Sequence, residues 1–120
     1  MSRSFSLFGR VIVAMLVISS TATAHTKMST SVPAQGSSVR TGLETIQLGF
    51  AKPVRVMVVK VKRTDQADDI PLVSQGKSAF ATSYDVKTTP LGAGTYDVNW
   101  TAIAKDGHVM KGTLSFTVTP

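Results

Sequence analysis

The stretch Leu91-Gly92-Ala93-Gly94-Thr95-Tyr96-Asp97-Val98-Asn99-Trp100-Thr101-Ala102 carries the clearest secondary-structure signal in the chain. A glycine-rich turn leads into a segment in which apolar and polar side chains alternate. One face of this segment carries the side chains of Tyr96, Val98, Trp100 and Ala102. A period of two predicts a half-buried β-strand.

Further strand signals lie on both sides of this stretch. Residues 44–50 alternate in the same way, until Ala51-Lys52-Pro53 breaks the pattern. Residues 54–61 are dense in valine and predict a strand covered on much of both faces, with Met57 packed inside. Weaker signals stand at 26–33, 70–73 and 80–86, and alternation returns at 114–118.

About seven short strands separated by turns, without helical periodicity after residue 24, predict one all-β domain, an antiparallel β-sandwich. The pattern Leu91-x-x-Gly94-x-Tyr96 is similar to the tyrosine corner of immunoglobulin-like sandwiches. The predicted core consists of Ile46, Leu48, Phe50, Val56, Val58, Tyr96, Val98, Trp100, Leu114, Phe116 and Val118.

The first 24 residues have the three parts of a secretory signal peptide. Arg3 and Arg10 form a basic region, residues 11–18 are continuously apolar, and Ala22-x-Ala24 fits the cleavage pattern. A membrane anchor is the alternative, but a membrane span needs about 20 apolar residues. We therefore expect cleavage after Ala24 and export of residues 25–120, with no part of the mature domain embedded in the membrane.

Removal of residues 1–24 leaves 96 residues with 11 Lys and Arg against seven acidic side chains, a net charge of +4. The cations are scattered and are not interleaved with aromatic residues, which argues against nucleic-acid binding. The chain contains no cysteine, so neither disulfides nor thiolate metal sites are available to it. Any metal site must use nitrogen, oxygen or thioether ligands.

Cleavage after Ala24 would make His25 the first residue of the mature protein. An N-terminal histidine can chelate one metal ion through its free α-amine and its imidazole Nδ1. The only other histidine, His108, lies in Asp106-Gly107-His108. Asp-Gly alone predicts a hairpin turn, which is the simpler interpretation of this triplet. If the chain is extended there, Asp106 and His108 project to the same side and could bind one ion. One amine, two imidazoles and one carboxylate form a set of donors that suits Cu(II) or Ni(II), and zinc also remains open.

The chain resembles the CopC family of periplasmic copper-binding proteins. The resemblance rests on the signal ending before His25 and on four ordered motifs. These are Ser31-x-Pro33-Ala34-x-Gly36, Leu48-x-Phe50-x-x-Pro53-Val54, Leu91-x-x-Gly94-x-Tyr96-x-Val98-x-Trp100, and Asp106-Gly107-His108-x-x-x-Gly112-x-x-x-Phe116. It covers essentially all of residues 25–120.

The resemblance implies a Greek-key β-sandwich that binds one Cu(II) ion per chain. The implied ligands are His25, through its amine and imidazole, His108, and Asp106 as a weaker oxygen donor. Some members also have a methionine-rich Cu(I) site, but here only Met28 and Met110 stand near a proposed ligand in the sequence. We therefore expect no dedicated Cu(I) site.

These observations favour a periplasmic, monomeric, non-enzymatic Cu(II) carrier. Such a carrier would buffer copper or deliver it to a separate inner-membrane transporter of the CopD type. A copper monooxygenase of the N-terminal-histidine type is one alternative, although its substrate surface would have to exclude Tyr96 and Trp100, which we place in the core. A metal-free immunoglobulin-like interaction module is the other.

Overall fold

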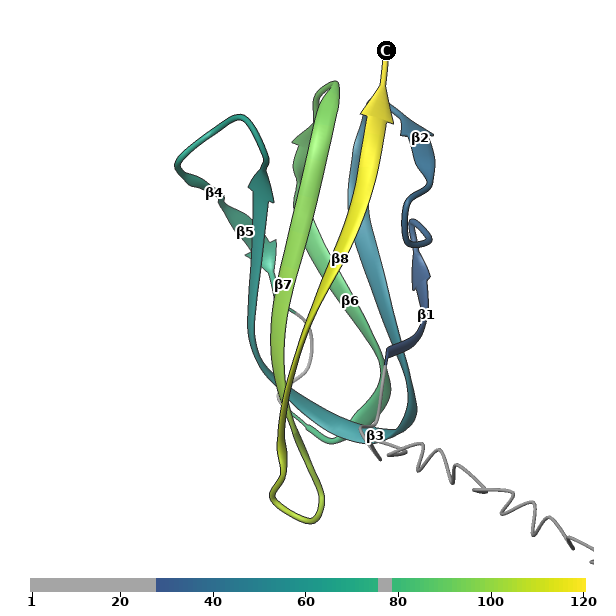
Figure 1. The fold of residues 1–120 in the computed structure, drawn as a ribbon, viewed down its shortest axis with the longest axis vertical. Coiled ribbons are helices and arrows are strands. Elements are labelled where there is room, and N and C mark those ends of the chain that lie inside the picture. The colour runs from purple at the N-terminus through teal and green to yellow at the C-terminus, as the bar shows by residue number, and fades with distance from the viewer. Residues whose placement is uncertain (1–27, 76–78) are drawn as a thin grey trace, which may run out of the picture.

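The computed structural model describes residues 28–75 and 79–120 (Figure 1), so the predicted signal peptide and His25 lie outside the described residues. The described residues form eight strands and no helix. The strands are β1 (Met28–Val32), β2 (Ser38–Arg40), β3 (Leu43–Arg63), β4 (Asp69–Ile70), β5 (Leu72–Ser74), β6 (Ala81–Leu91), β7 (Gly94–Ala104) and β8 (Val109–Thr119). The prediction of an all-β sandwich is confirmed. Within the described part of the chain, no helix is long and apolar enough to cross a membrane.

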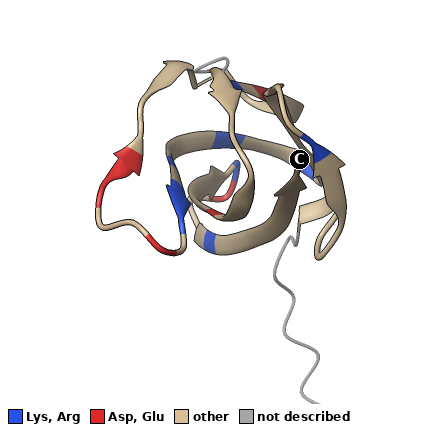
Figure 2. Cartoon of the chain, turned by 90° about the horizontal axis from the view of Figure 1, so that it is seen from above, with Lys and Arg blue, Asp and Glu red and all other residues tan. Residues whose placement is uncertain are grey.

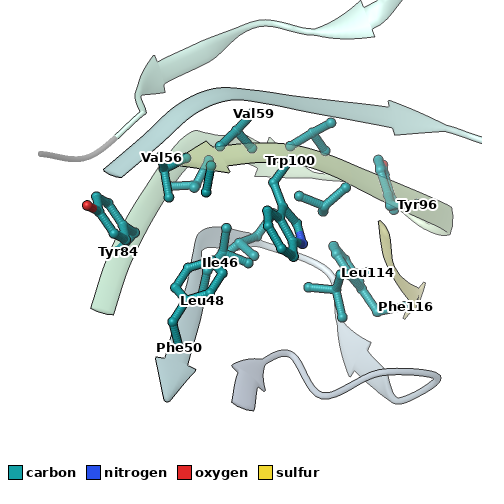
Figure 3. Close-up of a cluster of buried hydrophobic side chains, with 14 of the residues drawn as sticks. Ile46, Leu48, Phe50, Val56, Val59, Tyr84, Tyr96, Trp100, Leu114 and Phe116 are labelled. Carbon is teal, nitrogen blue, oxygen red and sulfur yellow. The ribbon is translucent and has the colours of Figure 1, made fainter. Parts of the chain in front are cut away.

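Two layers of strands are joined through β3. The first half of β3 pairs with β1 and β6, and β6 also pairs with β5. The second half of β3 pairs with β4 and β7, after which β8 and β2 complete the other layer. All of these pairings are antiparallel except β2 with β8. Seen from above, the strands surround a central space (Figure 2), which buried apolar side chains fill (Figure 3).

The sequence predicted a break at residues 51–53, but β3 continues through them as one strand of 21 residues. Ala51, Lys52 and Pro53 are all exposed, and the pairing with β6 is irregular between Gly49 and Val54. Proline cannot donate a backbone hydrogen bond, so it is tolerated where the strand leaves one partner for another. The break in the pattern therefore marks the point where β3 crosses from one layer to the other, at the lower end of Figure 1.

The prediction that Val54–Val61 is covered on both faces is wrong. Val54, Val56, Val59 and Val61 are buried, whereas Met57 and Val58 are 54% and 43% exposed. The pairing of β3 with β7 shifts between Val56 and Val58, which indicates a β-bulge. The extra residue reverses the alternation, so Val59 occupies the interior in place of Val58, and Met57 is not a core residue.

Ten of the eleven residues predicted for the core are buried, and Val58 is the exception. Phe50 packs edge-on against Trp100, at 5.1 Å between ring centroids, and against Tyr84 at 6.2 Å (Figure 3). The prediction missed several buried residues, namely Val54, Val59, Val61, Tyr84, Val86, Leu91, Ala102 and Met110. Both layers thus contribute to one hydrophobic core.

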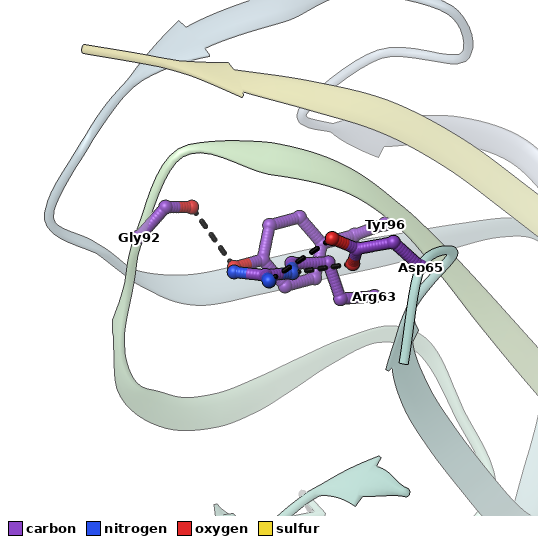
Figure 4. A network of polar contacts seen from close by, with 4 residues as sticks. All are labelled: Arg63, Asp65, Gly92 and Tyr96. Atoms are coloured by element: carbon purple, nitrogen blue, oxygen red, sulfur yellow. Dashed lines mark hydrogen bonds and ion pairs between the residues drawn. The ribbon is translucent and has the colours of Figure 1, made fainter. Parts of the chain in front are cut away.

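The predicted tyrosine corner is present at the start of β7. The hydroxyl of Tyr96 donates a 2.9 Å hydrogen bond to the carbonyl of Gly92 (Figure 4). Gly94 has φ of +155°, and the side chain of Arg63 fills the space where a Cβ would stand. The guanidinium of Arg63 binds both carboxylate oxygens of Asp65, at 2.6 and 3.0 Å. This corner fixes the end of the sandwich that lies opposite the Asp106–His108 turn.

Candidate metal centre

The turn between β7 and β8 carries the predicted metal-ligating triplet. The amide of Ala104 donates to the carbonyl of His108 at 2.9 Å, and the amide of Gly107 donates to the carbonyl of Ala104 at 3.0 Å. Gly107 has φ of +89°, a conformation that favours glycine. Asp-Gly therefore forms the hairpin turn that the sequence indicates, and this hairpin projects beyond the body of the sandwich (Figure 1).

Asp106 and His108 are in direct contact across this turn. One carboxylate oxygen of Asp106 accepts the backbone N–H of His108 at 3.1 Å, and the other lies 2.7 Å from the imidazole Nδ1. The two side chains do lie together, but in a turn and not on an extended strand as expected. That they bind one ion stays a prediction. Side chains of aspartate often bond the backbone two residues ahead in turns. That tendency is the signal that the sequence reading overlooked.

The contact defines which imidazole nitrogen is available to a metal. The hydrogen bonds from the His108 side chain and backbone hold the pKa of Asp106 below its ordinary value. An ionised carboxylate only accepts hydrogen bonds, so Nδ1 of His108 must carry the proton. The lone pair then resides on Nε2, and the His108 side chain is 82% exposed. A carboxylate behind the imidazole of a metal ligand is a common arrangement, because it fixes the ring and raises its basicity.

The relation of this pair to His25 is outside the described residues. No group of three or more His, Cys, Asp or Glu that could hold a metal occurs among residues 28–75 and 79–120. Met28 pairs with Phe50 just before the crossing of β3, and Ala104 pairs with Val54 just after it. The described chain therefore begins at the same end of the sandwich as the hairpin. The three residues that precede Met28 in the sequence can span at most about 10–11 Å, the length of a fully extended chain.

The two methionines near the proposed ligands in the sequence both contribute to the core, Met110 fully and Met28 in part. Met110 is 7% exposed and pairs with Ala102, with both side chains in the core. Met28 is half-buried and packs against the same core. Alternation along β8 turns the thioether of Met110 inward, so in this structure it lies with the core and not beside the exposed imidazole of His108.

Comparison with known proteins shows what this arrangement is similar to. The family model described as the CopC domain matches residues 28–119. Copper resistance protein C of Pseudomonas syringae pv. tomato is 31% identical over 121 residues, covering 92% of this chain and 94% of that protein. Copper resistance protein C of Escherichia coli is 33% identical over 108 residues, covering 81% of this chain and 83% of the relative.

Solved structures show the same fold. The crystal structure of PcoC, a methionine-rich copper resistance protein from Escherichia coli, matches with a TM-score of 0.67 and 30% identity. The match covers 80% of this chain and all of that one. CopC from Methylosinus trichosporium OB3b, at 19% identity and a TM-score of 0.63, supports the fold alone. With the family model covering nearly all described residues, the chain belongs to the CopC family.

Proposed function

We propose that this chain is a periplasmic, non-enzymatic copper-binding protein of copper resistance that carries one Cu(II) ion as cargo. Its membership of the CopC family and its similarity to copper resistance proteins support a role with copper. The observation that carries the proposal is the exposed imidazole of His108, whose Nδ1 is engaged by Asp106 and whose Nε2 has no hydrogen-bond partner among the described residues.

The proposed ligands are the α-amine and imidazole of His25, Nε2 of His108, and a weaker oxygen of Asp106. Nitrogen and oxygen donors of this kind suit Cu(II), which also binds most tightly among the common divalent metals. In this structure the Asp106 carboxylate lies on the Nδ1 side of the His108 ring, away from Nε2, so one of its oxygens can bind the same ion only if the side chain rotates away from the Nδ1–H. The amine donor requires cleavage directly before His25, since an amide nitrogen there would not bind in the same way.

We further propose that the protein is a monomer that buffers Cu(II) or delivers it to a separate inner-membrane transporter of the CopD type. The exposed position of the hairpin supports delivery, because a partner can reach the ligands without opening the fold. The monooxygenase alternative lacks support, because Tyr96 and Trp100 are 2% and 5% exposed and cannot form a sugar-binding platform.

The test is a Cu(II) titration against a competing chelator, using three proteins. The first begins at His25, the second has one additional N-terminal alanine, and the third carries His108→Ala. We expect the added alanine to reduce affinity by several orders of magnitude, because it removes the free amine from the chelate ring. His108→Ala should also weaken binding, since it removes one nitrogen ligand.

The same titration gives the expected pH dependence. Binding must deprotonate the α-amine, whose ordinary pKa is about 7.7–8.0, so affinity should fall as the pH drops below neutrality. Equal, tight binding by the first two proteins would contradict the proposed ligand set. Ascorbate-driven oxidation of chitin or cellulose by the copper-loaded protein would contradict the non-enzymatic role.

A further inference from the structure

We propose that the outer face of the β3–β7–β8 layer, next to the Asp106–His108 turn, is the docking surface for a copper-exchanging protein with an apolar contact area and an acidic rim. This inference rests on the proposed function as a copper carrier. We call the surface the hairpin-side patch and define it as Arg55, Met57, Val58, Phe80, Ile103 and Val109.

The patch gathers most of the exposed large apolar side chains in the described part of the chain. Of the six such side chains, the four that lie here are Met57, Val58, Phe80 and Val109, exposed by 54%, 43%, 36% and 63%. The guanidinium of Arg55 lies over the ring of Phe80, 4.7 Å from its centroid. Contiguous exposed apolar surface on a soluble protein is typical of interaction sites.

Strand register places these residues together. Arg55 pairs with Ile103, and Ile103 pairs with Val109, so the three form one row across the outer face. The next row consists of Val58, Thr101 and Lys111. Met57 is the extra residue of the bulge between these rows, and the bulge is what turns Met57 and Val58 outward.

The first row directly adjoins the proposed copper ligand. Val109 follows His108 in the sequence and begins β8. A partner seated on the patch would therefore meet the imidazole at its edge. Figure 1 shows the hairpin projecting at this end of the front layer, clear of the other strands.

The charges around the patch indicate the chemistry of the partner. The first two rows and the third row, Lys60–Asn99–Thr113, contain three cations and no acidic side chain. Arg55, Lys60 and Lys111 are exposed, and no ion pair engages them within the described residues. The first acid on this face is Asp97 in the fourth row, which accepts a 2.6 Å hydrogen bond from Ser115.

Asp106 in the adjoining turn is the acidic side chain next to the patch, and its carboxylate is engaged by the ring and backbone of His108. Asp65, Asp68 and Asp69 stand in and after the loop that joins β3 to β4, and this loop lies at the far end of the sandwich from the hairpin (Figure 1). A second copy docking by the same face would bring cations against cations, which is unfavourable. Acidic groups on a different protein would complement them. A membrane surface is less suitable, since the patch is a flat sheet face and lacks a protruding amphipathic helix.

The test compares two charge-reversal variants with the same change in net charge. The first, Arg55→Glu with Lys111→Glu, alters the patch. The control, Arg40→Glu with Lys87→Glu, alters exposed residues of β2 and β6. Each full-length variant is returned to cells that lack their own copy, and growth in copper is measured. We expect the first variant to lose resistance to the level of the deletion strain and the control to retain it.

Purified mature proteins separate this result from a failure of copper binding. Both variants should bind Cu(II) within about threefold of the wild type, because screened surface charges contribute little to such a site. If the patch variant has a lowered melting temperature, it is replaced by a second patch variant, Lys60→Glu with Lys111→Glu. Retained resistance in the patch variant, with resistance lost in His108→Ala, would overturn the docking surface alone. Retained resistance in His108→Ala would overturn the proposed function itself.

A photo-crosslinking residue at Val58 identifies the class of partner, with the same residue at Lys87 as the control. We expect a product specific to Val58 that joins this chain to an apolar segment flanked by Asp or Glu. A product containing two copies of this chain would overturn the proposal in favour of self-association. Sedimentation with phosphatidylglycerol-containing vesicles would overturn it in favour of a membrane surface.

Discussion

At the scale of single residues, Asp106 makes two hydrogen bonds within the turn, one to the backbone of His108 and one to its ring. Its carboxylate accepts from both the backbone and the ring of His108, so it orients the imidazole even before any ion is bound. Its exposure of 62% makes it unimportant for the core. The residue therefore allows metal binding to be perturbed without disturbing the fold.

We expect Asp106→Asn to reduce Cu(II) affinity by roughly 10- to 100-fold, the range common for residues that support metal-ligating histidines. The amide is neutral and cannot hold the imidazole N–H as strongly. Competition titration of the mature protein measures the effect, and thermal unfolding should show no change. Asp85→Asn, an exposed residue of β6 with the same change in charge, is the matched control. Equal affinities in the two variants would contradict a role for the Asp106 carboxylate.

The Arg63–Asp65 pair gives a pH prediction at the same scale. The hydrogen bond from Arg63 lowers the pKa of Asp65 below its ordinary value of 3.8. A depressed pKa means that the ionised carboxylate stabilises the fold above the unfolded pKa and that this contribution is lost as the pH falls through the folded pKa. Both side chains are partly exposed, so the effect should be small.

Urea unfolding of the wild type and Asp65→Asn therefore should show a difference in free energy of unfolding at pH 6. That difference should shrink as the pH is lowered below 4. A difference that stays constant down to pH 3 would mean that the carboxylate charge is irrelevant and that the substitution acts through shape.

At the scale of elements, the alternation of apolar and polar side chains predicted most of the regular strands. The strand from Tyr96 to Ala102, its partner from Leu114 to Val118, and the first half of β3 all follow the period of two and contribute the expected core residues. The Asp-Gly turn and the approach of Asp106 to His108 were also foreseeable. Local pattern is sufficient in these places because neighbouring side chains alone decide which face is buried.

What could not be predicted depends on pairing partners distant in sequence. The bulge at Met57–Val58 is defined only by the register between β3 and β7. Arg55 and Lys60, at an odd and an even position, show that the phase changes between them, but residues 56–59 are all apolar, so the sequence does not indicate which of them is the extra residue. The crossing of β3 likewise depends on β6 and β7 competing for adjacent stretches of one strand. His25 lies outside the described residues, so its part in the site stays a prediction.

Two adjacent valines test the bulge. Val59→Thr places a hydroxyl in the core at a position that is 4% exposed, whereas Val58→Thr changes a position that is 43% exposed. We expect Val59→Thr to cost about 1–3 kcal/mol, from burial of an unpaired hydroxyl, and Val58→Thr to change stability by less than about 0.5 kcal/mol. Chemical denaturation measures both. The reverse order would place the phase change elsewhere in β3.

At the scale of the whole molecule, β3 makes the two layers one unit. Because one strand belongs to both layers and both contribute to one core, neither layer keeps its interior when the other unfolds. We expect a single cooperative transition. Fluorescence of Trp100, the only tryptophan, and far-UV circular dichroism should give the same urea midpoint and slope. An earlier transition in fluorescence alone would show that the layer containing β7 unfolds separately.

The course of β8 also determines how the molecule can be handled. This strand begins beside His108 and runs 11 residues to Thr119, a rise of about 35 Å that separates the two ends of the sandwich (Figure 1). A biotin linked beyond Thr119 would therefore attach the protein to a sensor chip by the end remote from the turn. Every immobilised molecule would then present its imidazole to the flowing solution in the same orientation, so that copper transfer to candidate acceptors could be followed without the surface obstructing it.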